Sequence, residues 1–104
     1  MGDRPTHLRA IDGLVAAYTS QGEFAQALTQ LEARRSLTQG QANANEQLAT
    51  SRAFAEFYEK TGNLTVARDF YRQSLDLARQ LQDVEAERSL RNQLLNLEAA
   101  IATQ

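Results

Sequence analysis

Apolar residues recur along the chain at spacings of three and four, which is the pattern of amphipathic α-helices. Breaks at Gly22, Gly40 and Gly62, and a helix-capping Asp83, separate five such segments. The pattern predicts helices over residues 5–20, 23–38, 44–61 and 64–81, and a fifth that begins after Asp83. The polar run 41–45 is compatible with a loop or with the first turn of the third helix. The expected fold class is all-α.

Each predicted helix has one apolar stripe that is expected to face a neighbouring helix. The stripe residues are Leu8, Ile11, Leu14, Val15 and Tyr18, then Phe24, Ala27, Leu28, Leu31 and Leu37, then Leu48, Phe54, Ala55, Phe57 and Tyr58, then Leu64, Ala67, Tyr71, Leu75 and Ala78, and finally Leu90, Leu94, Leu97 and Ile101. The fifth segment has a second apolar line, Leu95, Ala99 and Ala102, which we expect to be exposed. It would either drive self-association or mark the end of a longer array.

The first and second pairs of helices repeat one pattern at a fixed offset. Tyr18 and Tyr58 differ by forty positions (58 − 18 = 40), as do Gly22 and Gly62. The same offset relates Leu14 to Phe54, Ala27 to Ala67 and Leu31 to Tyr71. A repeat of this length predicts a stacked array of helical hairpins.

The repeated positions resemble the tetratricopeptide repeat, in its longer, forty-residue variety. The motif residues are Leu14, Val15, Tyr18, Gly22, Ala27 and Leu31, and then Phe54, Ala55, Tyr58, Gly62, Ala67 and Tyr71. The resemblance implies a right-handed α-solenoid of antiparallel hairpins, with repeats over residues 5–40 and 41–81. Residues 83–103 then resemble a capping helix or a truncated third repeat, because Glu98 takes the tyrosine position and no glycine follows it.

The resemblance also implies a concave groove that binds a peptide or a helix. The positions that match the family's groove are Arg9, Asp12, Gly13, Ala16 and Thr19, then Ala49, Arg52, Ala53, Glu56 and Glu59, and then Ser89, Asn92, Gln93 and Asn96. The subgroup that grips chaperone tails has a basic clamp, which is absent here, so the expected partner is a protein segment of mixed charge. The alternative is that these charges pair with one another across neighbouring helices.

Composition reduces the number of function classes that fit the chain. The 104 residues have 11 basic and 13 acidic side chains, a net charge of −2, which does not favour nucleic acid as a partner. No cysteine is present and His7 is the only histidine, so we expect no metal, no cofactor and no enzymatic activity. No apolar run approaches the roughly 20 residues of a membrane span, and we expect a cytoplasmic protein without membrane contact.

The sequence therefore predicts a non-catalytic protein-binding module that acts as an adaptor, a scaffold or a regulatory domain. A second interpretation is a structural unit that dimerises through the fifth helix. A third is a fragment of a larger signalling protein or enzyme, which the incomplete third repeat would explain.

Overall fold

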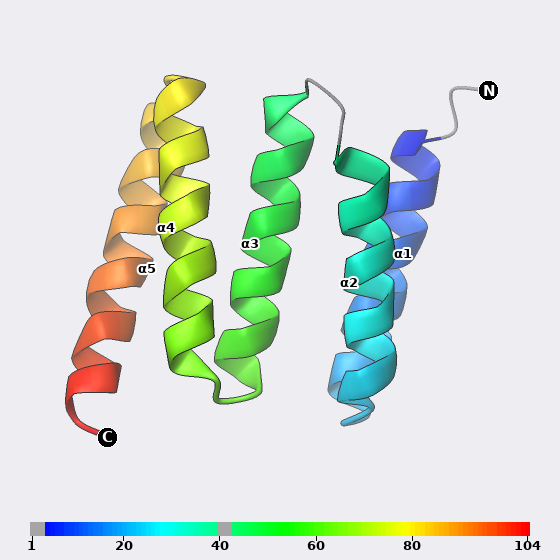
Figure 1. Ribbon diagram of the computed structural model, residues 1–104, viewed down its shortest axis with the longest axis horizontal. Coiled ribbons are helices and arrows are strands. Elements are labelled where there is room, and N and C mark those ends of the chain that lie inside the picture. Colours follow the sequence, from blue (N-terminus) through cyan, green and yellow to red (C-terminus); the bar gives the residue numbers. More distant parts are fainter. Residues whose placement is uncertain (1–3, 40–42) are drawn as a thin grey trace. The chain divides into compact units, whose positions relative to one another are not determined.

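A computed structural model describes residues 4–39 and 43–104 of the chain. These residues form five α-helices and no strand (Figure 1). The all-α class predicted from the sequence is confirmed. The chain divides into two compact units, Met1–Ala42 and Asn43–Gln104, which are described separately below.

The first unit contains an antiparallel hairpin of α1 (Arg4–Ser20) and α2 (Phe24–Thr38), which pack against each other. Leu8 and Ile11 of α1 and Ala27 and Leu31 of α2 are buried. Burial of a leucine or isoleucine side chain contributes roughly 1.5–3 kcal/mol, so these few residues account for much of the stability of this small hairpin.

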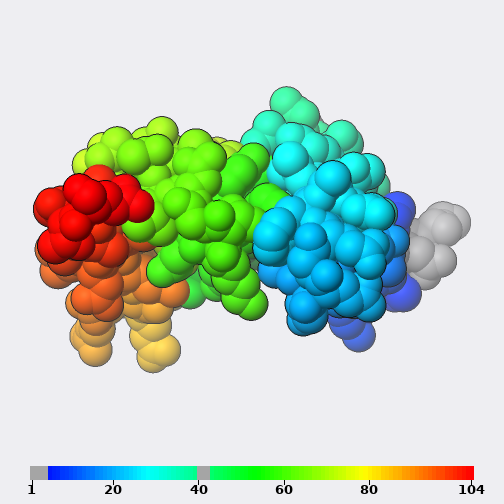
Figure 2. All heavy atoms as spheres, turned by 90° about the horizontal axis from the view of Figure 1, so that it is seen from below, coloured from blue at the N-terminus to red at the C-terminus, as the bar shows by residue number. Residues whose placement is uncertain are grey.

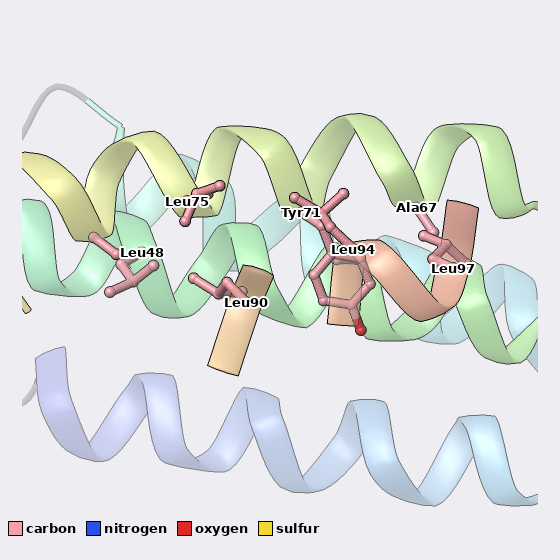
Figure 3. Close-up of a cluster of buried hydrophobic side chains, with 9 residues drawn as sticks. Leu48, Ala67, Tyr71, Leu75, Leu90, Leu94 and Leu97 are labelled. Atoms are coloured by element: carbon pink, nitrogen blue, oxygen red, sulfur yellow. The ribbon is translucent and has the colours of Figure 1, made fainter. Parts of the chain in front are cut away.

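The second unit contains α3 (Ala44–Lys60), α4 (Leu64–Gln80) and α5 (Val84–Ala102), with α4 packed against both of the other helices. Its core gathers side chains from all three helices (Figure 3). The buried members are Leu48, Ala55, Ala67, Tyr71, Leu75, Ala78, Leu90, Leu94 and Leu97. The Phe54 ring of α3 stacks on Phe70 of α4, which packs against this core, with the ring centroids 4.8 Å apart.

Three of the helix connections have the same backbone geometry. In each, the amide that follows the turn donates to a carbonyl five residues earlier: Glu23 to Tyr18 at 2.8 Å, Asn63 to Tyr58 at 2.9 Å and Asp83 to Ala78 at 3.0 Å. The middle residue has a positive φ, +77° at Gly22, +87° at Gly62 and +56° at Gln82. This is the left-handed helix ending that normally selects glycine, and Gln82 adopts it with a side chain.

The helix ends lie within one residue of the predicted bounds wherever bounds were predicted. The helices begin at residues 4, 24, 44, 64 and 84, so each starts twenty positions after the one before. The expected N-cap is confirmed, since the Asp83 carboxylate accepts from the Ala86 amide at 3.1 Å. Asn43 caps α3 in the same way, whereas the break expected at Gly40 lies outside the described residues.

Two expected core residues are not in the core. Leu14 and Phe24 are each 42 % exposed, although their spacing placed them on the inward stripes of α1 and α2. A hairpin of two helices covers only part of each apolar stripe, and the edges of both stripes stay open to solvent. All the expected inward residues of α3, α4 and α5 are buried or half-buried.

No helix in the described parts of the chain combines the length and the hydropathy needed to cross a lipid bilayer.

Candidate functional site

The predicted binding positions form one row in each odd-numbered helix. On α1 the row is Arg9, Asp12, Ala16 and Thr19, at spacings of three, four and three, which places them on one face of the helix. Arg9 and Ala16 are exposed and Thr19 is half-buried. The Thr19 hydroxyl oxygen is buried and forms no hydrogen bond with a described residue.

Asp12 is engaged within the first hairpin. Arg34 of α2 donates to its carboxylate from Nε at 2.7 Å and from Nη2 at 3.2 Å. The Arg34 side chain is 7 % exposed and that of Asp12 is 47 % exposed. A planar guanidinium fits a carboxylate well in this two-point geometry, and burial of the cation strengthens the interaction. Asp12 therefore joins α1 to α2 and offers a partner only the exposed side of its carboxylate.

The equivalent row on α3 is Ala49, Arg52, Glu56 and Glu59, each forty residues after its counterpart on α1. Ala49, Glu56 and Glu59 are exposed and Arg52 is half-buried. Arg52 forms no ion pair or hydrogen bond with any residue in the described ranges. The residue as a whole is half-buried, and Glu56 follows it one helical turn later.

Glu59 is tied to the core by the phenol of Tyr71, which donates to its carboxylate at 2.7 Å. Tyr71 is 1 % exposed. Burial raises the pKa of Tyr71 above its usual value, and the hydrogen bond to Glu59 together with the charges of Glu59 and Glu56 raises this pKa further, while Arg52 opposes the shift. The α3 row therefore lies close enough to this phenol for its charges to act on it, and Glu59 has a structural role beside any binding role.

The row on α5 is uncharged. Asn92 and Asn96, which are the counterparts of Arg52 and Glu56, are exposed. Gln93 is half-buried, and its Oε1 is buried without a hydrogen bond to a described residue. The exposed amides of this row, those of Asn92 and Asn96, can donate and accept hydrogen bonds.

Ion pairs join α4 to α5 on the opposite side of α5. Arg72 donates to Glu98 at 2.9 Å, and Arg79 donates to Glu87 at 3.5 Å. Arg91 also donates to Glu87 within α5. These groups are largely exposed, so each pair contributes no more than about 1 kcal/mol. They form in the same orientation of α5 that buries Leu90, Leu94 and Leu97.

The second apolar line of α5 is exposed, as predicted. Leu95 is 61 % exposed, and Ala99 and Ala102 are also exposed. Val84 belongs to the same face and is 65 % exposed, which the sequence reasoning missed because Val84 lies at the first position of the helix. Its spacing of eleven residues from Leu95 is close to three helical turns and could have revealed it.

The described residues contain no group of three or more histidine, cysteine or acidic side chains that could hold a metal ion. His7 is exposed in the first turn of α1.

Comparisons of the chain with protein-family models, with curated proteins and with solved structures found no match. The tetratricopeptide resemblance accordingly stays a prediction that depends on the residues themselves.

Proposed function

We propose that the chain is a tetratricopeptide-type, right-handed α-solenoid. The regular start of a helix at every twentieth residue supports this proposal, because a stacked array requires repeated units of equal length. The shared turn geometry supports it too, since the same hydrogen bonds follow Tyr18 in the first hairpin and Tyr58 in the second. Under this proposal residues 83–103 act as a cap or as the first half of a third repeat.

The proposed function is to bind a protein segment along the rows of α1, α3 and α5, as an adaptor, a scaffold or a regulatory domain. The observation that carries this proposal is Arg52, a half-buried arginine without an ion-pair partner among the described residues. Its guanidinium can therefore form a charge-assisted pair with an anion of the ligand. A bound carboxylate would supply that anion through two parallel hydrogen bonds.

The expected ligand is a peptide or helix of mixed charge. Glu56 lies one helical turn from Arg52 and is also exposed, so a carboxylate of the ligand would face Arg52 and a basic group would face Glu56. The exposed amides of Asn92 and Asn96 on α5 would form hydrogen bonds with the backbone of the same ligand. We further propose that the protein acts in the cytoplasm, without catalysis, a cofactor, a membrane or nucleic acid.

The test is to select ligands from a random peptide library with the wild-type protein and to titrate the selected peptides into two variants. Arg52→Glu should weaken binding by about tenfold or more, since it replaces an attraction with a repulsion. Lys60→Glu is the matched control, because it makes the same charge reversal on α3 at an exposed residue outside the row. It should leave the affinity within about threefold of wild type.

Nuclear magnetic resonance locates the ligand independently. Addition of the peptide should shift the backbone amide signals of Arg52, Glu56 and Gln93. The proposal would be wrong if the peptides bound Arg52→Glu as tightly as wild type and shifted only signals outside the three rows. The binding site would then lie elsewhere on the protein.

A further inference from the structure

One face of α5 has no described helix against it. It consists of Val84, Arg88, Arg91, Leu95, Ala99 and Ala102, at spacings of four, three, four, four and three, which define one stripe along the whole helix. All six residues are exposed. The last turns of α5, drawn in red in Figure 2, lie at the surface of the second unit.

The internal repeat indicates what kind of neighbour this face would take. Leu95 lies forty positions after Ala55 and eighty after Val15. Ala55 is fully buried in the core of the second unit, and Val15 is half-buried in the first hairpin. The part of the face from Val84 to Leu95 thus corresponds to positions at which α3 is covered, whereas Ala99 and Ala102 correspond to exposed residues of the second unit. A helix is the element that fits the covered part.

The charges on this stripe favour a second copy of the same helix. Arg91 lies one turn before Leu95 and Glu98 one turn after it, at the edge of the stripe. When two copies of α5 run antiparallel with Leu95 at the two-fold axis, Arg91 of each copy faces Glu98 of the other. A parallel pair would instead place arginine beside arginine and glutamate beside glutamate, which is unfavourable.

We propose that the chain forms a symmetric dimer through an antiparallel contact between two α5 helices centred on Leu95. The ion pairs of each protomer are compatible with it, since Glu98 also holds Arg72 and Arg91 also contacts Glu87 in its own chain. Across the contact, each arginine then has a glutamate neighbour in its own chain or in the second copy.

The contact is expected to be weak. Each α5 is about 28 Å long at 1.5 Å per residue, and only one stripe of it is buried, which is less area than the 1,200–2,000 Å² of a typical stable interface. Dimerisation should therefore appear at protein concentrations of about 10–500 μM.

Sedimentation equilibrium over that range measures the dimer directly. The wild-type mass should rise from one chain towards two chains, and Leu95→Arg should raise the dissociation constant by at least about tenfold. Ala100→Arg is the matched control, because it adds the same side chain to an exposed position on the opposite side of α5. It should dimerise like wild type, and circular dichroism should show equal helicity for all three proteins.

A charge exchange tests the antiparallel arrangement. Arg91→Glu and Glu98→Arg should each weaken the dimer, since each puts like charges opposite one another. The double variant Arg91→Glu/Glu98→Arg restores opposite charges across the contact but faces Arg72 and Glu87 with like charges within each chain. It should therefore recover part of the affinity, with a dissociation constant below that of either single variant. Rescue of this kind is not expected if the charges act only within one chain.

Three results would overturn the proposal. The first is a wild-type protein that stays monomeric up to the highest concentration, which would mean that the exposed face of α5 does not bind a second copy of α5. The second is a dimer that survives Leu95→Arg unchanged. The third is a double variant as weak as the single ones.

Discussion

The most informative test of the turn geometry is to replace Gln82 by glycine. Gln82 has a φ of +56°, in the region that L-residues avoid, while Gly22 and Gly62 occupy the same place in the other two turns. Backbone strain of a side chain in this region costs about 1–2 kcal/mol, which glycine would remove. Glycine also has more conformational freedom in the unfolded chain, and this offsets about 0.5–1 kcal/mol of the stabilisation. Gln82→Gly should therefore raise the free energy of unfolding by about 0.5–1 kcal/mol.

The reverse change at an equivalent turn has the opposite sign. A Cβ atom added at Gly62 would meet no atom within 4 Å, so the cost of Gly62→Ala comes from the backbone alone. We expect Gly62→Ala to lower the free energy of unfolding by about 1 kcal/mol. The side chain of Gln82 is exposed, so its removal should forfeit no packing.

Urea unfolding followed by circular dichroism at the helical band measures both changes. For an unfolding slope near 1 kcal/mol per molar urea, the midpoint should rise by about 0.5–1 M for Gln82→Gly. The matched control is Gln73→Gly, the same substitution at an exposed position in the middle of α4. There glycine should cost about 0.5–1 kcal/mol, so the two variants should move the midpoint in opposite directions. A midpoint that falls for both would refute the strain assigned to the turn.

Two further predictions concern the core of the second unit. Leu90 is fully buried and Leu95 is 61 % exposed. In urea unfolding, Leu90→Ala should lower the free energy of unfolding by about 2–5 kcal/mol, whereas Leu95→Ala at low protein concentration should change it by no more than about 0.5 kcal/mol. Equal costs would contradict the orientation of α5. Because the pKa of Tyr71 is raised, the unfolded chain loses that proton near pH 10 while the folded protein keeps it, so the free energy of unfolding should fall above about pH 10 by up to about 1.4 kcal/mol per pH unit. Tyr71→Phe should lack this part of the alkaline loss, and an identical pH profile for both proteins would exclude the assignment.

Helix positions could be predicted from the sequence because local signals determine them. Glycine at positions 22 and 62 and aspartate at 83 mark helix boundaries, and apolar spacing marks the faces in between. The left-handed conformation of Gln82 was not predicted, since glutamine has no preference for it. It follows from the length of the turn, which matches the two glycine turns.

Contacts between helices were harder to predict. The sequence alone did not reveal that Asp12, twenty-two positions before Arg34, supplies the carboxylate that Arg34 binds. Leu14 satisfies the spacing of an inward residue but lies at the open edge of its stripe. Spacing identifies a face of a helix, while its coverage depends on neighbours that are distant in the sequence.

The ion pairs between α4 and α5 have a consequence for the azimuth of α5 about its own axis. Leu94 and Leu95 are adjacent, and a rotation of about 100° would exchange the buried leucine for the exposed one. The rotated setting would replace Leu90, Leu94, Leu97 and Ile101 in the core by Arg91, Leu95, Glu98 and Ala102, so hydrophobic burial strongly disfavours it. The pairs of Arg72 with Glu98 and of Arg79 with Glu87 are formed in the setting that buries the leucines. Buried leucines and exposed charges thus specify the same side of the last helix for contact with the surroundings.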